Sequence, residues 1–311
     1  MEPPRLAELR IYYNTTIRPE LMRTERMRRS LLWRVAISIV LSLLMVSAVV
    51  VLKLSFLLLF LIPVAILYVA NLLYRFEKFR QKFKPAVVQL LLDFMNVSPN
   101  YQSLSYEPKR AIGKDRFDRS GLFQTRMASY GAEDYIKGIV GEMPFEMGEI
   151  YVQEESRASH RLQLVFAGIF VHAKFNEVTR GQLAVWPRSA ENRMHRSIKA
   201  YYARGGRNVD HEIMNPAFLE EFVVYAVEGT VVREILTDPM QSALVAFARE
   251  QEDRDLFFAV HDQDLFAAVS HERDLLEPSF FQSNVTFDLI REFYIDITTI
   301  LKVLSDFDQT H

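Results

Sequence analysis

The densest group of basic residues in the chain lies between Arg188 and Arg207. This stretch of twenty residues holds six Lys and Arg side chains and His195, against a single acid, Glu191. Cations at this density could bind the carboxylates of an acidic partner or the anionic headgroups of a membrane leaflet. The six bases are Arg188, Arg193, Arg196, Lys199, Arg204 and Arg207.

The same stretch has the pattern of a short amphipathic helix. Ser189 is a suitable N-cap and Gly205 a suitable end. Two interpretations stay open: a solvated insertion, or a helix that docks on the membrane surface or on an acidic partner. The apolar side chains that fall near one face are Met194, Ile198, Tyr201 and Tyr202. The docking interpretation predicts contact through Arg193, Arg196, Lys199 and Arg204.

Histidine and carboxylate side chains are most concentrated between His261 and Asp274. A metal site needs such groups clustered at suitable spacing, but the seven histidines are scattered and no pair lies at i, i+4. A solvated polar hairpin explains the same residues, so we predict no metal site and no cofactor. The group consists of His261, Asp262, Asp264, His271, Glu272 and Asp274.

Familiar catalytic patterns are missing from the sequence. It has no glycine-rich phosphate loop, no Gly-x-Ser-x-Gly nucleophile elbow and no cysteine. Catalytic residues therefore cannot be assigned, and two classes of function remain. One is a membrane-tethered module that holds a protein or lipid partner. The other is a membrane-anchored enzyme with an unfamiliar site, with hydrolysis as the leading reaction class. The missing motifs favour the module.

Two long apolar blocks lie upstream of these groups. Residues 35–52 are eighteen uncharged positions and residues 54–74 are twenty-one, with Lys53 as the one ionisable residue between them. A helix rises about 1.5 Å per residue and the hydrocarbon core is about 30 Å thick, so about twenty apolar residues span it. The sequence therefore predicts a transmembrane helical hairpin over residues 35–74.

The charges that flank this hairpin predict its topology. Residues 1–84 carry a net charge of +9, and residues 85–311 carry −11. Lys and Arg gather at both outer ends of the hairpin, which places both termini in the cytoplasm. We expect a basic helical segment over residues 1–34 and a juxtamembrane amphipathic helix over residues 75–97. The bases of the second helix that we expect to contact lipid are Lys78, Arg80, Lys82 and Lys84.

The acidic region after the hairpin limits the possible partners. A net charge of −11 over residues 85–311 would repel a phosphate backbone, so we expect no nucleic-acid partner. The lipid bilayer is the expected partner, with another membrane protein or an anionic lipid as further candidates. Self-association stays open.

The hydrophobic pattern of the C-terminal part predicts a cytoplasmic α+β domain over residues 134–311. We expect an irregular connection over residues 98–133, and then a mainly antiparallel sheet with helices on one side. A cap at Thr237 begins one of these helices. The predicted strands cover residues 135–140, 145–154, 162–175, 182–186, 222–227, 256–261 and 265–270, and the main helices residues 238–249 and 287–306.

A series of short motifs runs along the chain: Gly131 to Tyr135 with Gly138, Glu149 to Tyr151, Phe166 to Phe170 with Phe175 and Asn176, Gly181, Phe222 to Tyr225, Arg233, Leu236, Thr237, Met240, and Leu276 to Ser279. In this order, and together with the preceding hairpin, they resemble the bacterial two-pass membrane family catalogued as domain of unknown function 3137. This chain departs from the family at Ala226, Val227 and Glu228, where members typically show an acidic residue and a serine. The resemblance implies a bacterial inner-membrane protein and no particular activity.

Overall fold

The computed structural model places the chain in two compact units. The helical unit comprises Pro4–Phe94 and Leu276–Tyr294, and the sheet unit comprises Met95–Leu275 and Ile295–His311 together with the first three residues. The residues that the structure describes are 6–51, 53, 56, 58–156, 159–175, 181–251, 253–271 and 281–308.

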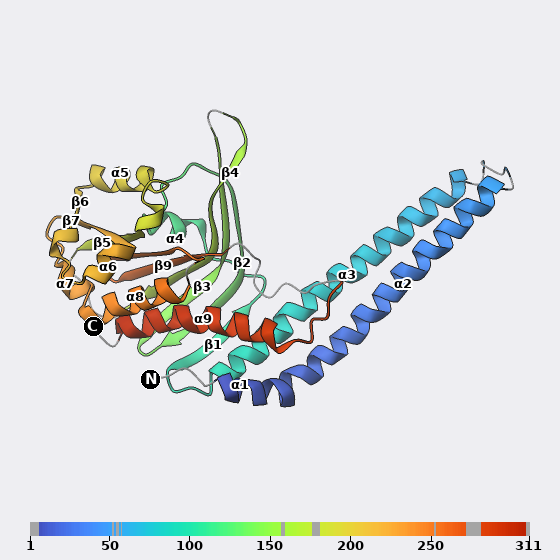
Figure 1. The fold of residues 1–311 in the computed structure, drawn as a ribbon, viewed down its shortest axis with the longest axis horizontal. Helices are drawn as coiled ribbons and strands as arrows, with labels where there is room; N and C mark the ends of the chain where they lie inside the picture. Colours follow the sequence, from blue (N-terminus) through green and yellow to red (C-terminus); the bar gives the residue numbers. More distant parts are fainter. Residues whose placement is uncertain are drawn as a thin grey trace. The chain divides into compact units, whose positions relative to one another are not determined.

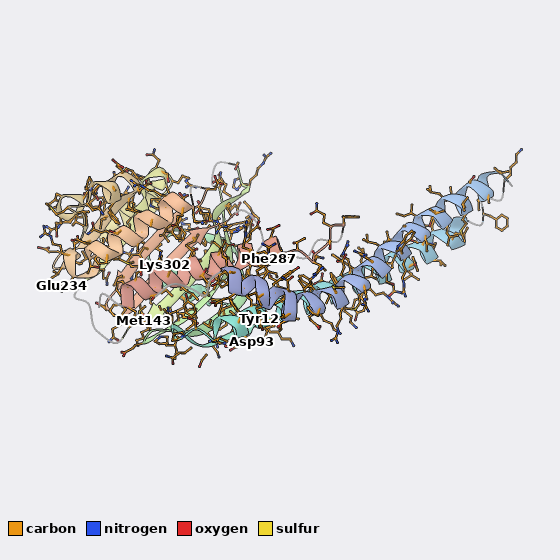
Figure 2. All side chains as sticks on the ribbon, turned by 60° about the horizontal axis from the view of Figure 1, so that its bottom comes forward. Tyr12, Asp93, Met143, Glu234, Phe287 and Lys302 are labelled. Carbon is orange, nitrogen blue, oxygen red and sulfur yellow. The ribbon has the colours of Figure 1, made fainter. Side chains whose placement is uncertain are left out.

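The helical unit is built from long helices. Figures 1 and 2 show α2 and α3 lying side by side over most of their length. α1, the π-helix η1 and α2 follow one another without a break, and Pro19 lies directly after the π-helical turn. The elements are α1 (Leu6–Tyr12), the π-helix η1 (Tyr13–Ile17), α2 (Arg18–Val51), α3 (Leu58–Met95) and the beginning of α9 (Phe287–Asp308).

Large apolar side chains on α2 and α3 are exposed. Trp33, Leu43 and Leu67 expose 70%, 67% and 71% of their surface, and many neighbours do the same. Water would solvate such a surface poorly, whereas lipid tails would cover it at no cost. Among the described residues, one helix, Leu6–Val49, is long and apolar enough to cross a membrane, with a mean hydropathy of 2.2. This supports membrane association, and the predicted second pass stays a prediction.

Aromatic side chains join the helices of this unit near its N-terminus. The ring centroid of Phe94 on α3 lies 5.1 Å from that of Tyr12 on α1 and 6.1 Å from that of Tyr294 on α9. Tyr13 packs edge-on against Phe287 at 5.4 Å. The first turns of α9 therefore pack against α1, η1 and α3 (Figure 2).

In the part of the chain that the structure describes, the sheet unit is built on one antiparallel sheet of nine strands in the order β1-β2-β3-β4-β9-β8-β5-β7-β6 (Figure 1). The predicted α+β class, with an apolar N-terminal helix before the domain, is confirmed. The strands are β1 (Tyr101–Glu107), β2 (Met127–Val140), β3 (Met143–Glu155), β4 (Leu162–Lys174), β5 (Gln182–Pro187), β6 (Gly206–Asn208), β7 (Phe222–Val227), β8 (Leu256–His261) and β9 (Asp264–Ser270).

Helices of the sheet unit begin where the sequence offers caps. The Thr237 side chain accepts a hydrogen bond from the Met240 N–H at the start of α8, which confirms the predicted cap. Asn215 caps α6 in the same way, and Pro216 follows it. The remaining helices are α4 (Lys114–Arg119), η3 (Arg188–Ala190), α5 (His195–Ala203), η4 (Asp210–Glu212), α6 (Pro216–Glu221), α7 (Val232–Ile235) and α8 (Asp238–Glu250).

Helices cover both faces of the sheet, so the prediction of helices on one side is wrong. On one face, Trp186 and Phe257 belong to a core cluster with Phe117 of α4 and Tyr201 of α5. On the other face, Phe258 packs against Phe307 of α9 at 6.1 Å. The central strands are therefore buried on both sides, which explains why β5, β7, β8 and β9 read as continuous apolar runs rather than alternating ones.

The expected irregular connection over residues 98–133 is a second correction. It contains β1 and α4, and β2 already begins at Met127. β1 is an edge strand whose sequence is mostly polar, and only Tyr101 and Leu104 are buried in it. Its pairing with β2 shifts between Gln102 and Ser105. Such a strand has no hydrophobic alternation, so the sequence pattern could not reveal it.

Candidate functional site

The predicted basic helix forms, but its N-cap, Met194, lies five residues after the predicted cap Ser189. A short 3₁₀ turn, η3, covers Arg188–Ala190, and the α-helix α5 starts at His195. Ser189 does not cap it, because its hydroxyl lies 3.0 Å from a carboxylate oxygen of Asp255. This contact joins the segment before α5 to the loop before β8, and the helix begins only after that segment.

The apolar face of α5 packs on the sheet. Met194, Ile198 and Tyr201 are buried, as their spacing suggests, whereas Tyr202 is half exposed. The Tyr201 ring meets Trp186 edge-on at 5.8 Å, and the Trp186 Nε1–H donates to the Leu122 carbonyl oxygen at 3.1 Å. These side chains form part of the domain core and are not available for insertion into lipid.

Three of the six bases pair with the domain's own acids. Arg196 makes a two-pronged contact with Glu154, with nitrogen–oxygen distances of 2.6 and 2.9 Å. Arg193 pairs with Asp255, and Arg188 with Asp210. The hydrogen bond from Arg196 is the main reason that the pKa of the Glu154 carboxyl is lowered, and the same contact raises the pKa of Arg196.

The other bases remain on the surface. Among the described residues, no carboxylate lies within ion-pair distance of Lys199, Arg204 or Arg207, and all three side chains are exposed. The guanidinium of Arg204 lies over the Tyr201 ring at 5.7 Å, and its Nε–H donates to the Ala200 carbonyl oxygen. The free positive charge of this stretch is therefore at its C-terminal end, after Arg196.

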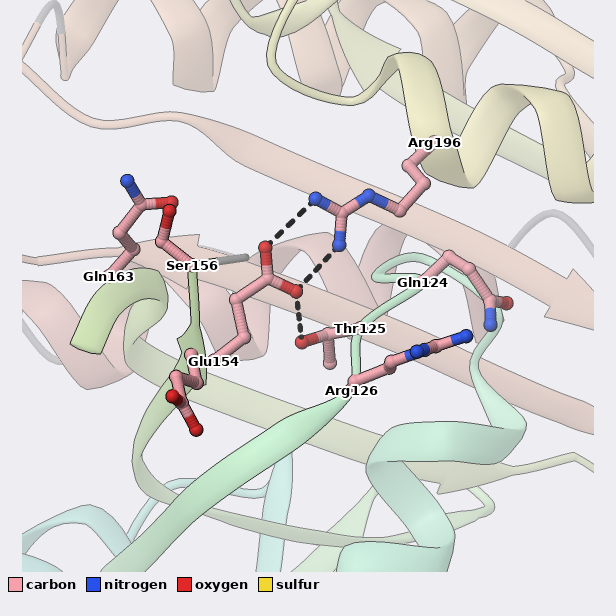
Figure 3. A pocket seen from close by; sticks show the side chains of 8 residues that line it. Gln124, Thr125, Arg126, Glu154, Ser156, Gln163 and Arg196 are labelled. Atoms are coloured by element: carbon pink, nitrogen blue, oxygen red, sulfur yellow. Dashed lines mark hydrogen bonds and ion pairs between the residues drawn. The ribbon is translucent and has the colours of Figure 1, made fainter. Parts of the chain in front are cut away.

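A cavity of about 460 Å³ opens beside α5, and Figure 3 shows its lining. Arg196 forms one wall with its partner Glu154, which also accepts a hydrogen bond from the Thr125 hydroxyl at 3.1 Å. Arg126 supplies a second guanidinium, which has no carboxylate partner among the described residues. The full lining is Gln124, Thr125, Arg126, Glu154, Glu155, Ser156, Gln163 and Arg196.

Sheet pairing brings these residues together. Met127 of β2 lies opposite Glu154 of β3, and Glu154 lies opposite Gln163 of β4. Arg126 directly precedes β2, so it enters the cavity from the next strand over. Arg126 and Glu154 were not predicted from the sequence, because they are 28 positions apart and no local pattern connects them. Had the pairing of β3 with β4 been predicted from the sequence in its observed register, it would have placed Gln163 beside Glu154.

The arrangement suits binding of an anionic group. Two guanidiniums flank the cavity, and hydroxyl and amide groups complete its polar wall. Glu154 is a poor general base because its pKa is lowered and both of its oxygens are engaged. None of the eight described lining residues is a histidine. The cavity therefore favours recognition over proton-transfer chemistry.

The juxtamembrane bases that were predicted to contact lipid differ in their exposure. Lys84 is buried within the helical unit, with 7% of its surface exposed. The Lys78 ammonium lies over the Tyr74 ring at 4.9 Å, and Lys82 is exposed. The Arg80 side chain lies outside the described residues. Lipid contact stays a prediction, and Lys78 and Lys82 are the side chains placed to make it.

The histidine and acid group near the β8–β9 hairpin does not form one site. Asp264 lies 2.7 Å from His172 of β4, whereas His271 lies 3.6 Å from Asp296 of α9. Burial lowers the pKa of His261, and the nearby Arg204 adds to this effect. Glu272 and Asp274 lie outside the described residues. The members that can be placed therefore serve different parts of the domain.

A known family matches the C-terminal part of the chain. Residues 164–309 match the family described as "Protein of unknown function (DUF3137)". The match runs from β4 to the end of α9 and supports the resemblance seen in the motifs. A similar solved structure is the crystal structure of the mycobacterial trehalose monomycolate transport factor A, TtfA, at 11% identity and a TM-score of 0.27 over 64% of this chain and 88% of that one. No curated protein matches the chain.

Proposed function

We propose that the chain is a two-pass protein of a bacterial inner membrane, with both termini in the cytoplasm. Its sheet unit is an interaction module that holds a protein or lipid partner at the inner leaflet. The exposed apolar surfaces of α2 and α3 and the Lys- and Arg-rich flanks of the predicted hairpin support the membrane part of this proposal.

One observation carries the binding part. The cavity beside α5 contains Arg126, which has no carboxylate partner among the described residues. The exposed Lys199 lies on α5, and the exposed Arg204 directly follows the last residue of that helix. These three bases, Arg126, Lys199 and Arg204, stand out because residues 85–311 carry a net charge of −11. An acidic group on a partner would find complementary charge here and like charge over much of the remaining surface, which orients the encounter.

The binding test uses the full chain in its native membrane. A photo-crosslinking amino acid at Tyr202, which is half exposed on α5, should capture the partner, and mass spectrometry identifies the adduct as protein or lipid. Each base near an anionic surface contributes about 1 kcal/mol, so the double change Lys199→Gln with Arg204→Gln should lower the adduct yield up to about 30-fold.

A matched control removes two charges elsewhere in the sheet unit. Arg233→Gln with Arg249→Gln changes net charge equally, and Arg249 makes only loose surface pairs with Glu220 and Glu221. This variant should keep the adduct yield. Equal losses in both double variants, or equal adducts from a probe at the exposed Met214, would leave α5 as a solvated insertion.

Topology is tested separately. A cytoplasmic reporter fused after His311 should be active, and a periplasmic reporter inserted beside Lys53 should be active too, because bases flank both outer ends of the predicted hairpin. A periplasmic signal at His311 would contradict the cytoplasmic placement of the module, whatever the crosslinking shows.

A further inference from the structure

A second cavity, of about 390 Å³, lies on the sheet away from α5. It is lined by parts of β1, β2, β3 and β4, by α4 and by the loop that precedes α4. Four of its described lining residues are Lys or Arg: Arg110, Arg116, Lys137 and Lys174. No sequence motif pointed to this group, because its four members come from four separate segments.

A histidine held between two carboxylates forms the base of this cavity. The His172 Nδ1 lies 3.1 Å from a Glu146 oxygen, and its Nε2 lies 2.7 Å from an Asp264 oxygen. The side chain is 8% exposed, and its ring stacks on Phe266. A neutral imidazole has one N–H, and a carboxylate only accepts. Both contacts are therefore hydrogen bonds only when both ring nitrogens carry a proton.

Glu146, the one carboxylate among the described lining residues, is already fully engaged. Glu146 accepts from His172 and from the Tyr135 hydroxyl, which lies 2.8 Å away, and the Arg116 Nε lies 3.3 Å from it. The hydrogen bond from His172 is the largest of the influences that lower the pKa of Glu146 to about 2. Glu146 therefore stays ionised and holds the cationic wall in place.

The cations of this cavity outnumber its acids. Glu107 pairs with Lys137 at 2.5 Å and with Arg110 at 3.7 Å, and Asp264 is engaged with His172. The four described Lys and Arg side chains face three carboxylates, those of Glu107, Glu146 and Asp264. Among the described residues, Lys174 has no ion-pair partner. These groups therefore leave positive charge unbalanced at a solvent-accessible hollow, inside a region whose net charge is negative.

We propose that this cavity binds the phosphate group of a phosphate monoester. Such a group carries a charge between −1.5 and −2 near neutral pH and three acceptor oxygens, which matches the excess positive charge and the several N–H donors. Lys174 supplies an ammonium that has no ion-pair partner among the described residues. Arg116 contacts Glu146 through its Nε, so the terminal nitrogens of its guanidinium can donate to the ligand. The proposal does not depend on α5 or on its partner.

The test uses the full chain in a neutral detergent at low salt. Glycerol 3-phosphate is titrated and followed by calorimetry and by phosphorus NMR, with glycerol as the neutral probe. Saturable binding of the phosphate compound and none of glycerol is expected. Lys174→Gln and Arg116→Gln should each raise the Kd about tenfold, because each removes one strong charge-assisted contact.

Two further arms separate a real site from general charge. Arg249→Gln, which removes a distant surface base, should leave the Kd unchanged. In the second arm, phosphatidic acid in mixed micelles replaces glycerol 3-phosphate. The comparison of the two Kd values shows whether the site prefers a free phosphate compound or a phosphate carried by a lipid, and saturable binding of either one supports a phosphate site. Absence of saturation with both probes, or equal effects of Arg249→Gln and Lys174→Gln, would overturn the proposal.

Discussion

Replacing Gly168 with alanine should destabilise the sheet unit by about 4 kcal/mol or more, the range in which backbone strain and direct overlap combine. Gly168 has a φ of +148°, which side chains rarely tolerate. A Cβ there would lie 2.0 Å from the Val269 carbonyl oxygen and 2.8 Å from the His271 nitrogen. Both are backbone atoms of the neighbouring β9 segment, so neither can move without breaking the β4–β9 pairing.

Urea unfolding of the full chain in neutral micelles measures this effect. Trp186 is fully buried in the core, so its fluorescence reports unfolding once Trp33 has been replaced by phenylalanine. Gly229→Ala is the matched control. Its φ is +87°, yet nothing lies within 4 Å of the added Cβ, so it should cost only the strain of about 1–2 kcal/mol. Equal unfolding free energies for the two variants would contradict the overlap argument.

Asp296→Ala should destabilise the sheet unit by about 3–5 kcal/mol, because it leaves a largely buried charge without its partner. An Arg254 nitrogen lies 2.5 Å from one Asp296 oxygen, and the His271 Nε2 lies 3.6 Å from the other. The Asp296 and Arg254 side chains are 6% and 22% exposed. Arg254 retains some access to water, so a value near the lower end of this range is expected.

A second variant separates the loss of a charge partner from the loss of packing. Arg254→Met combined with Asp296→Leu removes both charges and keeps apolar volume, so it should recover most of the stability. The same urea experiment compares the single and double variants. If the double variant is as unstable as Asp296→Ala, then packing around α9, and not the stranded guanidinium, accounts for the loss.

The parts of the fold that were predictable are those whose own segments carry a regular pattern. The strands at 222–227 and 256–261 were placed at their observed bounds, and the helix after Thr237 was found from its cap and its 3.6-residue period. Strand β1 was missed because an edge strand needs little apolar surface. The second layer of helices was missed because burial on both faces is a property of the assembled sheet.

The candidate sites were less predictable, for a physical reason. The run of bases between Arg188 and Arg207 is visible in the sequence, but their acids are not local: Glu154 and Asp255 come from other strands and loops. The pair of His172 with Asp264 likewise joins residues 92 positions apart. Side chains that meet through strand pairing leave no spacing signature, and which cations remain unpaired follows only from that pairing.

The strand order also sets when the sheet can be completed during synthesis. The β8–β9 hairpin, near the C-terminal end, lies in the sheet between β4 and β5. Until those residues leave the ribosome, β4 and β5 present open edges, and the earlier strands form two separate half-sheets. Pairing β4 with β9 closes a loop of roughly a hundred residues, which is slow by its contact order. Nascent chains of this protein therefore depend on β8 and β9 to become resistant to aggregation.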